Sequence, residues 1–215
     1  MSEATLGAVL AGGLGRRMGG GDKPLRMLCG TPLLVHVLDR LRPQVRALVL
    51  NANGDPARFG AVAPGLPVVA DGIAGHPGPM AGILAALDHA VAERPDLPWV
   101  ITVPGDTPFI PADLATRLHA ARRAAGVPLA WAASGGRAHP PIGLWPVSLR
   151  DDLRAALLSG ERSVGRWAAR HGGATVEWSD DPDPFFNANT PEELAAAEVS
   201  IARSRRSAPP SDQVG

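Results

Sequence analysis

The sequence predicts an α/β fold with a mostly parallel central sheet. Short apolar segments of strand length alternate with amphipathic segments of helix length along most of the chain. Helices between strands favour right-handed crossovers that join parallel strands. Glycine-rich or polar residues directly follow several apolar segments, as expected where a ligand binds at the carboxyl ends of the strands.

Strands and helices alternate regularly over the first half of the chain. Apolar runs that end in glycine or polar residues predict strands at residues 6–10, 46–53, 66–71 and 97–106. Thr31 is expected to be the N-cap of the first helix, with Pro32 in its first turn. The apolar residues at helical spacing in the three predicted helices are Leu34, Val37, Leu38 and Leu41, then Met80, Ile83, Leu84, Leu87 and Val91, then Leu114 and Leu118.

The alternation continues less regularly over the second half. Strands are predicted at residues 127–134, 141–147 and 173–179, and Pro146 is expected to interrupt the second of them. Two short helices are marked by Leu149, Leu153 and Leu157 and by Ser163, Val164, Trp167 and Ala168. A capping box at residues 190–193 is expected to open a last helix. We expect one domain over residues 1–202 and a disordered tail over residues 203–215, which are poor in apolar side chains.

Composition excludes several classes of function. The 215 residues include 21 basic and 21 acidic ones, so there is no positive surplus for binding a nucleic acid. Cys29 is the only cysteine, which excludes an intramolecular disulfide and a zinc site built from cysteines. No apolar segment approaches the ~18 residues of a membrane span, and the N-terminus does not resemble a signal peptide. We therefore expect a cytoplasmic protein that binds neither nucleic acid nor membrane.

A glycine-rich, basic loop follows the first predicted strand. Residues 7–25 read GAVLAGGLGRRMGGGDKPL and include Lys23, the single lysine of the chain. Glycines let backbone N–H groups approach an anion, and Arg16, Arg17 and Lys23 can add charge-assisted hydrogen bonds to phosphate. The spacing fits neither a Walker A loop nor a dinucleotide fingerprint. The sequence predicts a phosphate-binding loop, and the alternative is a flexible surface loop.

Two carboxylates end predicted strands. Asp106 follows the longest apolar run, where an unpaired carboxylate would be costly. Magnesium accepts one or two carboxylates together with phosphate oxygens, so we predict that Asp106 binds Mg²⁺ rather than capping the next helix. Asp71 is a second carboxylate near the site, a hydrogen-bond partner of a base, or a turn residue at the strand end. His139, in a proline-containing loop, is either a ligand contact or a loop residue. The histidines on predicted helices are expected at the surface or its boundary: His36, His89, His119 and His171.

Together these segments resemble the molybdenum cofactor guanylyltransferases. The resemblance covers residues 7–197 and rests on LAGGLGRRMGGGDKPL, LNAN, VVADGIAGHPGPMAG, VPGDTPFIPADLA, GGRAHPPIGLW and FFNANTPEELA. The first segment is shared with nucleotidyltransferases that activate sugars or pterins, whereas its combination with PGPMAG, PGDTPFIP and FNANTPEEL is more specific. The resemblance implies a three-layer, Rossmann-like nucleotidyltransferase fold with a mostly parallel central sheet.

The activity implied by the resemblance is Mg²⁺-dependent transfer of GMP from GTP to molybdopterin. Pyrophosphate would be released, and the product would be the molybdopterin guanine dinucleotide cofactor. The alternatives are a cytidylyltransferase acting on the same pterin, a sugar-nucleotide pyrophosphorylase, and a non-catalytic GTP-binding sensor or carrier. Because the product must reach a target enzyme, molybdoenzymes or their chaperones are candidate partners.

The resemblance also implies which residues contact GTP. They are Leu10, Ala11, Gly12, Gly13, Lys23, Asn51, Asp71, Gly78, Gly82 and Asp106. Asn51 and Asp71 would contact the nucleoside, and Gly78 and Gly82 would let the backbone approach the guanine.

Three residues are the implied catalytic groups. Asp106 would hold Mg²⁺, and Arg17 and Lys23 would stabilise the charge that develops on the phosphates during transfer. Asn187 and Asn189, in the FNANTP segment, match positions associated with the pterin.

Overall fold

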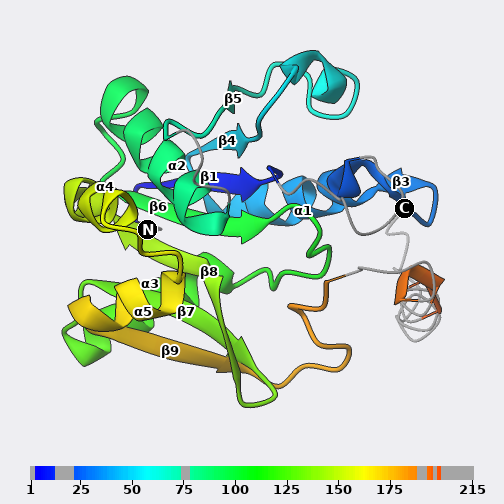
Figure 1. Cartoon of the computed structure of the whole chain (residues 1–215). Helices are drawn as coiled ribbons and strands as arrows, with labels where there is room; N and C mark the ends of the chain where they lie inside the picture. Colours follow the sequence, from blue (N-terminus) through cyan, green and yellow to red (C-terminus); the bar gives the residue numbers. More distant parts are fainter. Residues whose placement is uncertain (1–2, 13–21, 74–77, 188–192, 196–197, 200–215) are drawn as a thin grey trace, which may run out of the picture.

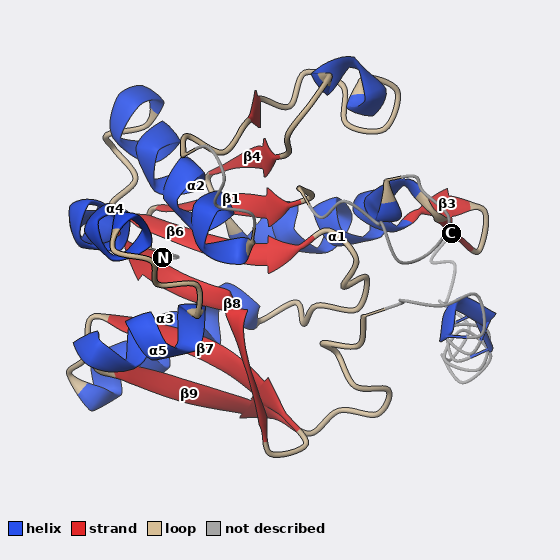
Figure 2. Ribbon diagram, in the orientation of Figure 1, coloured by secondary structure: helices blue, strands red, loops and turns tan. Residues whose placement is uncertain are grey.

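A seven-stranded sheet forms the centre of the protein, and helices cover both of its faces (Figures 1 and 2). The computed structural model describes residues 3–12, 22–73, 78–187, 193–195 and 198–199. In spatial order the strands are β5 (Val68–Val69), β4 (Ala47–Asn51), β1 (Thr5–Leu10), β6 (Trp99–Pro104), β8 (Arg137–Pro146), β7 (Leu129–Ser134) and β9 (Gly173–Trp178). Only β8 runs antiparallel to its neighbours in this sheet, so the predicted α/β class with a mostly parallel sheet is confirmed.

The helices form the outer layers of a three-layer arrangement. They are α1 (Leu33–Leu41), α2 (Pro79–Glu93), α3 (Leu114–Ala125), α4 (Arg150–Leu158) and α5 (Val164–His171). One core cluster joins α1 and α3 to Val9 and Ile101 of the sheet, and the other joins α2, α4 and α5 to Leu6 and Val100. Side chains of β1 and β6 thus enter the cores on both faces, as in parallel sheets covered by helices on each side.

Short 3-10 turns complete the described elements. They are η1 (Lys23–Leu25), η2 (Arg42–Gln44), η3 (Pro56–Phe59) and η4 (Val147–Leu149). Among the described helices, none is long and apolar enough to span a bilayer. The predicted capping residues 190–192 and the predicted tail, residues 203–215, lie outside the described part of the chain.

The first helix begins later than predicted. Thr31 belongs to a short strand, β3 (Thr31–Pro32), which pairs with β2 (Met27–Leu28), and α1 then begins after Pro32 as its N-cap. Cys29 and Gly30 join the two strands with positive φ angles of 50° and 76°. The predicted N-cap role of Thr31 is wrong because the hairpin uses the extended backbone of that residue.

Pro146 does not interrupt its strand, contrary to the prediction. β8 runs without a break from Arg137 and ends at Pro146. Leu144 is the last residue of β8 that pairs with β7, so the missing N–H of Pro146 breaks no pairing on that side. The predicted third strand is confirmed but is confined to Val68 and Val69.

His119 is buried rather than at the surface, so that prediction is wrong. Its side chain lies under the amino end of the sheet, where Nε2 is 2.8 Å from the hydroxyl of Thr5. Burial lowers the pKa of His119 to about 4, against a weaker opposing effect of Glu3. His36, His89 and His171 are half-buried, as predicted.

Candidate active site

Three neighbouring strands end level with one another at one edge of the sheet. Leu10, the last residue of β1, lies opposite both Asn51 of β4 and Pro104 of β6. Hydrogen bonds continue past the strands, because Ala11 N donates to Asn51 O at 2.8 Å and Gly105 N donates to Leu10 O at 2.9 Å. The segments that follow the three strands therefore meet, as expected for a ligand site in an open α/β sheet.

Lys23 and Asp106 form an ion pair across this edge. Lys23 opens η1, after the glycine-rich stretch of the sequence, and Asp106 follows β6. Both side chains are mostly shielded, with exposed fractions of 18% and 17%. A pair so placed keeps a compact cation and a carboxylate together where a charged ligand can reach both.

Gly105 lets η1 pack closely over the end of β6. A Cβ at Gly105 would lie 3.2 Å from Pro24 Cγ, which is tighter than ordinary contact. Pro24 is buried in η1, next to Lys23. The close approach of Pro24 to Gly105 therefore sets the position of Lys23 relative to Asp106.

Asn51, Asn53 and Asp71 form a second polar cluster beside the first. Asn51 Nδ2 donates to Asp71 Oδ1 at 3.0 Å, and Asn53 Nδ2 donates to Asp71 Oδ2 at 2.7 Å. Asp71 N in turn donates to Asn53 Oδ1 at 2.9 Å. Two amides thus hold both oxygens of the carboxylate, so Asp71 is fixed at the ends of β4 and β5. The structure brings Asp71 to the predicted ligand edge.

The start of α2 closes against this cluster. Gly78 is its N-cap, with φ of 130°, a conformation that favours glycine. One turn later, Gly82 faces Asn51 so closely that a Cβ would overlap Asn51 Oδ1. The two glycines thus let the helix begin beside Asn51.

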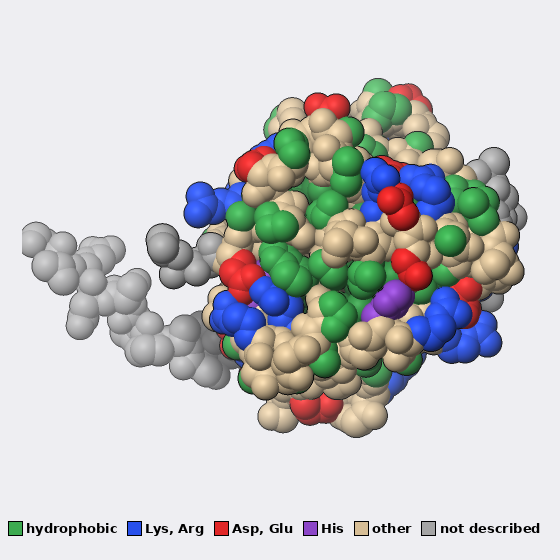
Figure 3. Space-filling model, turned by 90° about the vertical axis from the view of Figure 1, so that its left-hand side faces the viewer, with side chains coloured by type: hydrophobic (Ala, Val, Ile, Leu, Met, Phe, Trp, Pro, Cys, Tyr) green, Lys and Arg blue, Asp and Glu red, His purple; other side chains and the backbone are tan. Residues whose placement is uncertain are grey.

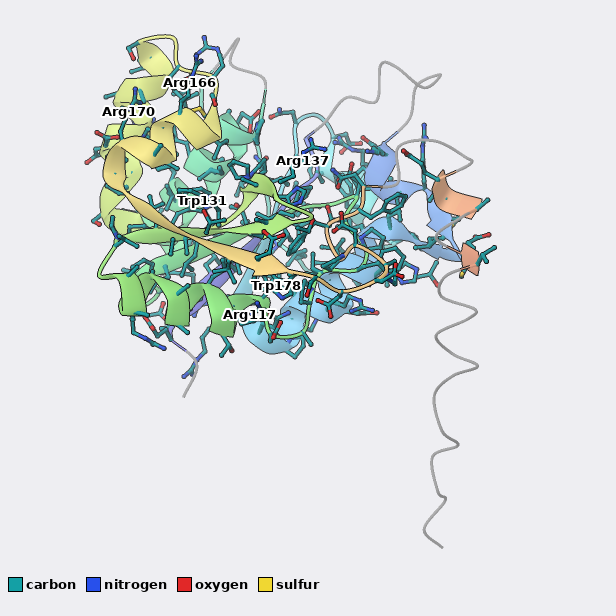
Figure 4. The ribbon with its side chains drawn as sticks, turned by 90° about the horizontal axis from the view of Figure 1, so that it is seen from below. Arg117, Trp131, Arg137, Arg166, Arg170 and Trp178 are labelled. Carbon is teal, nitrogen blue, oxygen red and sulfur yellow. The ribbon has the colours of Figure 1, made fainter. Side chains whose placement is uncertain are left out.

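Residues after β9 return along the sheet to the same edge. Phe185 is buried, with its ring centroid 5.2 Å from that of Trp178 and 5.3 Å from that of His139. Trp178 also packs against Arg117 of α3, whose guanidinium lies 4.1 Å from the ring centroid (Figure 4). Beyond this anchor, Asn187 reaches the end of β6, where it accepts a hydrogen bond from the Thr107 hydroxyl at 2.7 Å.

His139 lies beside this returning segment. Its Nε2 is 2.7 Å from the Ser134 hydroxyl, and burial lowers its pKa. The imidazole is therefore held by contacts within the chain, which favours a packing role for His139 over direct contact with a ligand.

Several predicted site residues lie outside the described part of the chain. They are Gly13, Arg17 and Asn189. The structure brings together the strand-end residues Leu10, Ala11, Gly12, Asn51, Asp71 and Asp106, along with Lys23, Gly78, Gly82 and Asn187 around them.

Sequence reasoning missed Asn53 and Thr107 as site residues. Both lie within segments that were singled out, Asn53 in LNAN and Thr107 in PGDTP. Asparagine and threonine are common in turns, so the residue types alone did not mark either position as part of the site. Reasoning from the sequence also missed the ion pair between Arg58 Nε of η3 and Asp22 Oδ2, at 2.7 Å, which ties η3 to the residue before Lys23.

The carboxylate of Asp106 suits a magnesium ion shared with a phosphate ligand. The described residues contain no group of three or more histidine, cysteine or acidic side chains that would enclose a metal. Mg²⁺ keeps several waters and binds with one or two carboxylates plus substrate phosphates. A single half-buried carboxylate at the strand ends, where a phosphate ligand can supply further oxygens, fits that requirement.

An apolar hollow lies at the opposite end of the sheet. It has a volume of about 500 Å³ and is lined by Leu97, Trp99, Pro146 and the exposed Val91. Figure 3 shows this end of the molecule, where hydrophobic side chains gather between charged ones. The hollow shares no residue with the polar edge described above.

Comparison with known proteins agrees with this geometry. Residues 7–175 match the MobA-like NTP transferase domain family. A protein of Bradyrhizobium sp. (strain ORS 278) is 57% identical over 96% of this chain and 98% of its own length. A protein of Rhodopseudomonas palustris (strain BisB5) is 56% identical over 94% of this chain and 97% of its own length. Both bear the name molybdenum cofactor guanylyltransferase.

Solved structures share the fold. Molybdopterin-guanine dinucleotide biosynthesis protein A from Archaeoglobus fulgidus superposes with a TM-score of 0.71 at 26% identity, over 92% of this chain and 99% of its own. A Mycobacterium tuberculosis protein solved as a manganese complex superposes with a TM-score of 0.67 at 18% identity, over 92% of this chain and 99% of its own, and shows the fold alone. The match of the domain, the two close relatives and the strand-end site lead to one conclusion: the chain belongs to the molybdenum cofactor guanylyltransferase family, within the MobA-like NTP transferases.

Proposed function

We propose that this protein transfers GMP from GTP to Mo-molybdopterin, releasing pyrophosphate and forming molybdopterin guanine dinucleotide. The observation that carries the proposal is the ion pair of Lys23 and Asp106 at the meeting point of β1 and β6. It gives a nucleoside triphosphate a cation for its phosphates and gives a metal a carboxylate. The names of the close relatives indicate guanine as the base of the nucleotide and the molybdenum cofactor as the acceptor.

The chemistry needs positioning more than a general base. The terminal phosphate of the pterin is already ionised when it attacks the α-phosphorus of GTP, so no side chain has to remove its proton. Nucleotidyl transfer then depends on alignment and on neutralising the phosphate charges. This fits a site in which a lysine and a carboxylate lie in contact at the strand ends.

Each part of the site takes one part of GTP. The backbone of residues 10–13 lines the nucleotide, Asn51 and Asp71 contact the nucleoside, and Gly78 and Gly82 make room for the guanine. Lys23 turns its ammonium from Asp106 to a phosphate oxygen when the nucleotide enters. Arg17 adds charge at the phosphates, and Asn187 and Asn189 bind the pterin.

Asp106 is the residue that would hold Mg²⁺. When bound there, the ion neutralises negative charge on the phosphates of GTP. Until then, Lys23 balances the carboxylate, which keeps a mostly shielded charge from standing alone.

The test is the release of pyrophosphate by the purified protein. Molybdopterin and Mg²⁺ are supplied with either GTP or CTP, and pyrophosphate is measured with a coupled enzyme assay. We expect release with GTP and little with CTP. Release with CTP alone would make the protein a cytidylyltransferase, and binding of GTP with no release would make it a sensor or carrier.

A further inference from the structure

Two consecutive residues, Asp22 and Lys23, are tied to the segments that follow two different strands. Asp22 Oδ2 lies 2.7 Å from Arg58 Nε, and Arg58 belongs to η3, which comes after β4 in the chain. Lys23 pairs with Asp106, which follows β6. Because β1 lies between β4 and β6 in the sheet, the chain at residues 22 and 23 is held from both sides of β1.

Arg58 is itself anchored in the segment after β4. Its Nη1 donates to Asp55 O at 3.0 Å, and its guanidinium lies 4.5 Å from the ring centroid of Phe59, which is buried. Gly54, with φ of 85°, leaves room for it, since a Cβ there would lie 3.0 Å from Arg58 Nη1. The side chains of Arg58 and Asp22 are only 25% and 26% exposed, and salt screens such a pair less than an exposed one. Arg58 therefore gives Asp22 a fixed partner.

The two ion pairs differ in what ligand binding does to them. In the proposed function, Mg²⁺ takes the Asp106 carboxylate and a phosphate oxygen takes the Lys23 ammonium, so the pair of Lys23 and Asp106 opens. The pair of Arg58 and Asp22 involves neither of these groups and can persist. Pro24 supports the backbone at Lys23 from the side of β6, and Arg58 supports it from the side of β4, whichever partner the ammonium takes.

We propose that Arg58 is a positioning residue for the polyphosphate of the nucleotide, acting through Asp22 on the neighbouring Lys23. The geometry favours positioning over direct contact, because Nε of Arg58 faces Asp22 and Nη1 is engaged by Asp55 O. The role rests on the proposed function, in which Lys23 binds the phosphates. It extends the site to η3, a segment to which the sequence assigned no function.

Asp22→Asn separates positioning from a simple effect of charge. Removal of a negative charge beside a phosphate site should by itself strengthen the binding of an anion. Loss of the ion pair that positions Lys23 should instead weaken it, and we expect a Kd about fivefold higher. Arg58→Met should cause a similar loss, and Arg58→Lys, which keeps the charge, should recover part of it. A direct contact of Arg58 with phosphate predicts the opposite for Asp22→Asn, because the variant would release the guanidinium to the ligand.

The experiment is a calorimetric titration of the full-length protein with inorganic tripolyphosphate in the presence of MgCl₂. The proposal expects weaker binding in both Asp22→Asn and Arg58→Met, and unchanged or tighter binding in Asp22→Asn would overturn it. In the double variant the loss should not exceed that of the more affected single variant. Additive losses would show that the two residues act separately, which would also overturn the proposal.

Two further variants test the path of the effect and its dependence on stability. Added to Lys23→Met, Asp22→Asn should weaken tripolyphosphate binding no further, whereas a further fivefold loss would contradict a role through Lys23. Arg154→Met is the matched control, because it breaks an ion pair with Asp88 of similar exposure, between α4 and α2. It should lower thermal stability and leave the affinity unchanged; an equal loss of affinity there would reduce the effect of Asp22→Asn to one of stability.

Tripolyphosphate has no base, and the titration contains no acceptor, so its outcome does not depend on which nucleotide or acceptor the protein uses. The expected pattern in a protein that releases no pyrophosphate from GTP or CTP would reject the proposed function and keep the role of Arg58. Release of pyrophosphate from GTP together with unchanged or tighter tripolyphosphate binding in Asp22→Asn would keep the function and reject that role.

Discussion

Gly82 of α2 lies directly against Asn51 at the end of β4. A Cβ at Gly82 would overlap Asn51 Oδ1 and would lie 3.0 Å from Leu10 Cδ2. The Asn51 carboxamide cannot turn aside at no cost, because Nδ2 donates to Asp71 Oδ1 at 3.0 Å and to Val69 O at 3.2 Å. Because position 82 carries no side chain, Asn51 can keep the position in which it hydrogen-bonds Asp71.

Gly82→Ala should weaken GTP binding by about tenfold, because the added methyl displaces Asn51 from Asp71 and costs roughly one buried hydrogen bond. Isothermal titration with GTP measures the effect. Gly72→Ala is the matched control, since a Cβ there would make an ordinary contact with Asp88 Oδ2 at 3.8 Å. Equal GTP affinity in the two variants would show that the contact between Gly82 and Asn51 does not shape the nucleotide site.

Asp106→Asn should slow pyrophosphate release by about 100-fold or more, because it removes the charge that would hold Mg²⁺ while keeping the side-chain shape. The rate is measured across a range of MgCl₂ concentrations, and wild-type protein treated with a chelator should lose activity and regain it with added Mg²⁺. Asp96→Asn is the control, since Asp96 is exposed and pairs with Arg94 far from the site. Wild-type rates in Asp106→Asn would rule out its metal role.

Local periodicity was sufficient to predict the fold class, and its failures occur where pairing or packing against another element decides the local structure. Alternating apolar runs and helical spacing depend only on neighbours in the chain, and every predicted strand and helix that falls within the described residues is present. Thr31, Pro146 and His119 were misplaced for a different reason. Their surroundings depend on a hairpin partner, on where pairing with β7 stops, and on the Thr5 hydroxyl 114 positions away in the sequence.

The sequence was sufficient to predict those parts of the candidate site that directly follow the strands. Because ligands bind at the carboxyl ends of parallel strands, the sequence predicted that Lys23 and Asp106 lie at the same site, although they are 83 positions apart in the sequence. Nothing in the sequence distinguished Asn53 or Thr107 from ordinary turn residues, because asparagine and threonine are common there. Their importance comes from partners, Asp71 and Asn187, that only the folded chain brings within hydrogen-bonding distance.

Stability should fall as the pH drops from about 6.5 to about 4, because the folded protein holds His119 neutral. Burial lowers its pKa from 6.5 to about 4, so the unfolded chain binds more protons over that range. Above pH 6.5 the neutral His119 of the folded protein costs no stability. Between pH 6.5 and pH 4 the free energy of unfolding falls, by about 3 kcal/mol at most. Urea unfolding at pH 7.5 and pH 5 measures the difference. His119→Gln should reduce the pH dependence of the free energy of unfolding, whereas His89→Gln, at a half-buried position of α2, should not. An unchanged pH dependence in His119→Gln would contradict the assignment to His119.

Asn53→Asp should weaken GTP binding more than Asn53→Ala does. Asn53 makes two hydrogen bonds to Asp71: its Nδ2 donates to Asp71 Oδ2 at 2.7 Å, and its Oδ1 accepts from the Asp71 backbone N–H at 2.9 Å. Alanine removes both bonds and leaves Asp71 held by Asn51 alone, which should raise the Kd for GTP about fivefold. Aspartate instead places a second carboxylate against the first, and like charges at hydrogen-bonding distance repel, so Asp71 is driven away from its position. GTP titrations of the two variants at low and high salt separate the effects, because salt screens the repulsion between the two carboxylates. The excess loss in Asn53→Asp should shrink at high salt, and a loss that is equal in both variants at every salt concentration would show that repulsion does not displace Asp71.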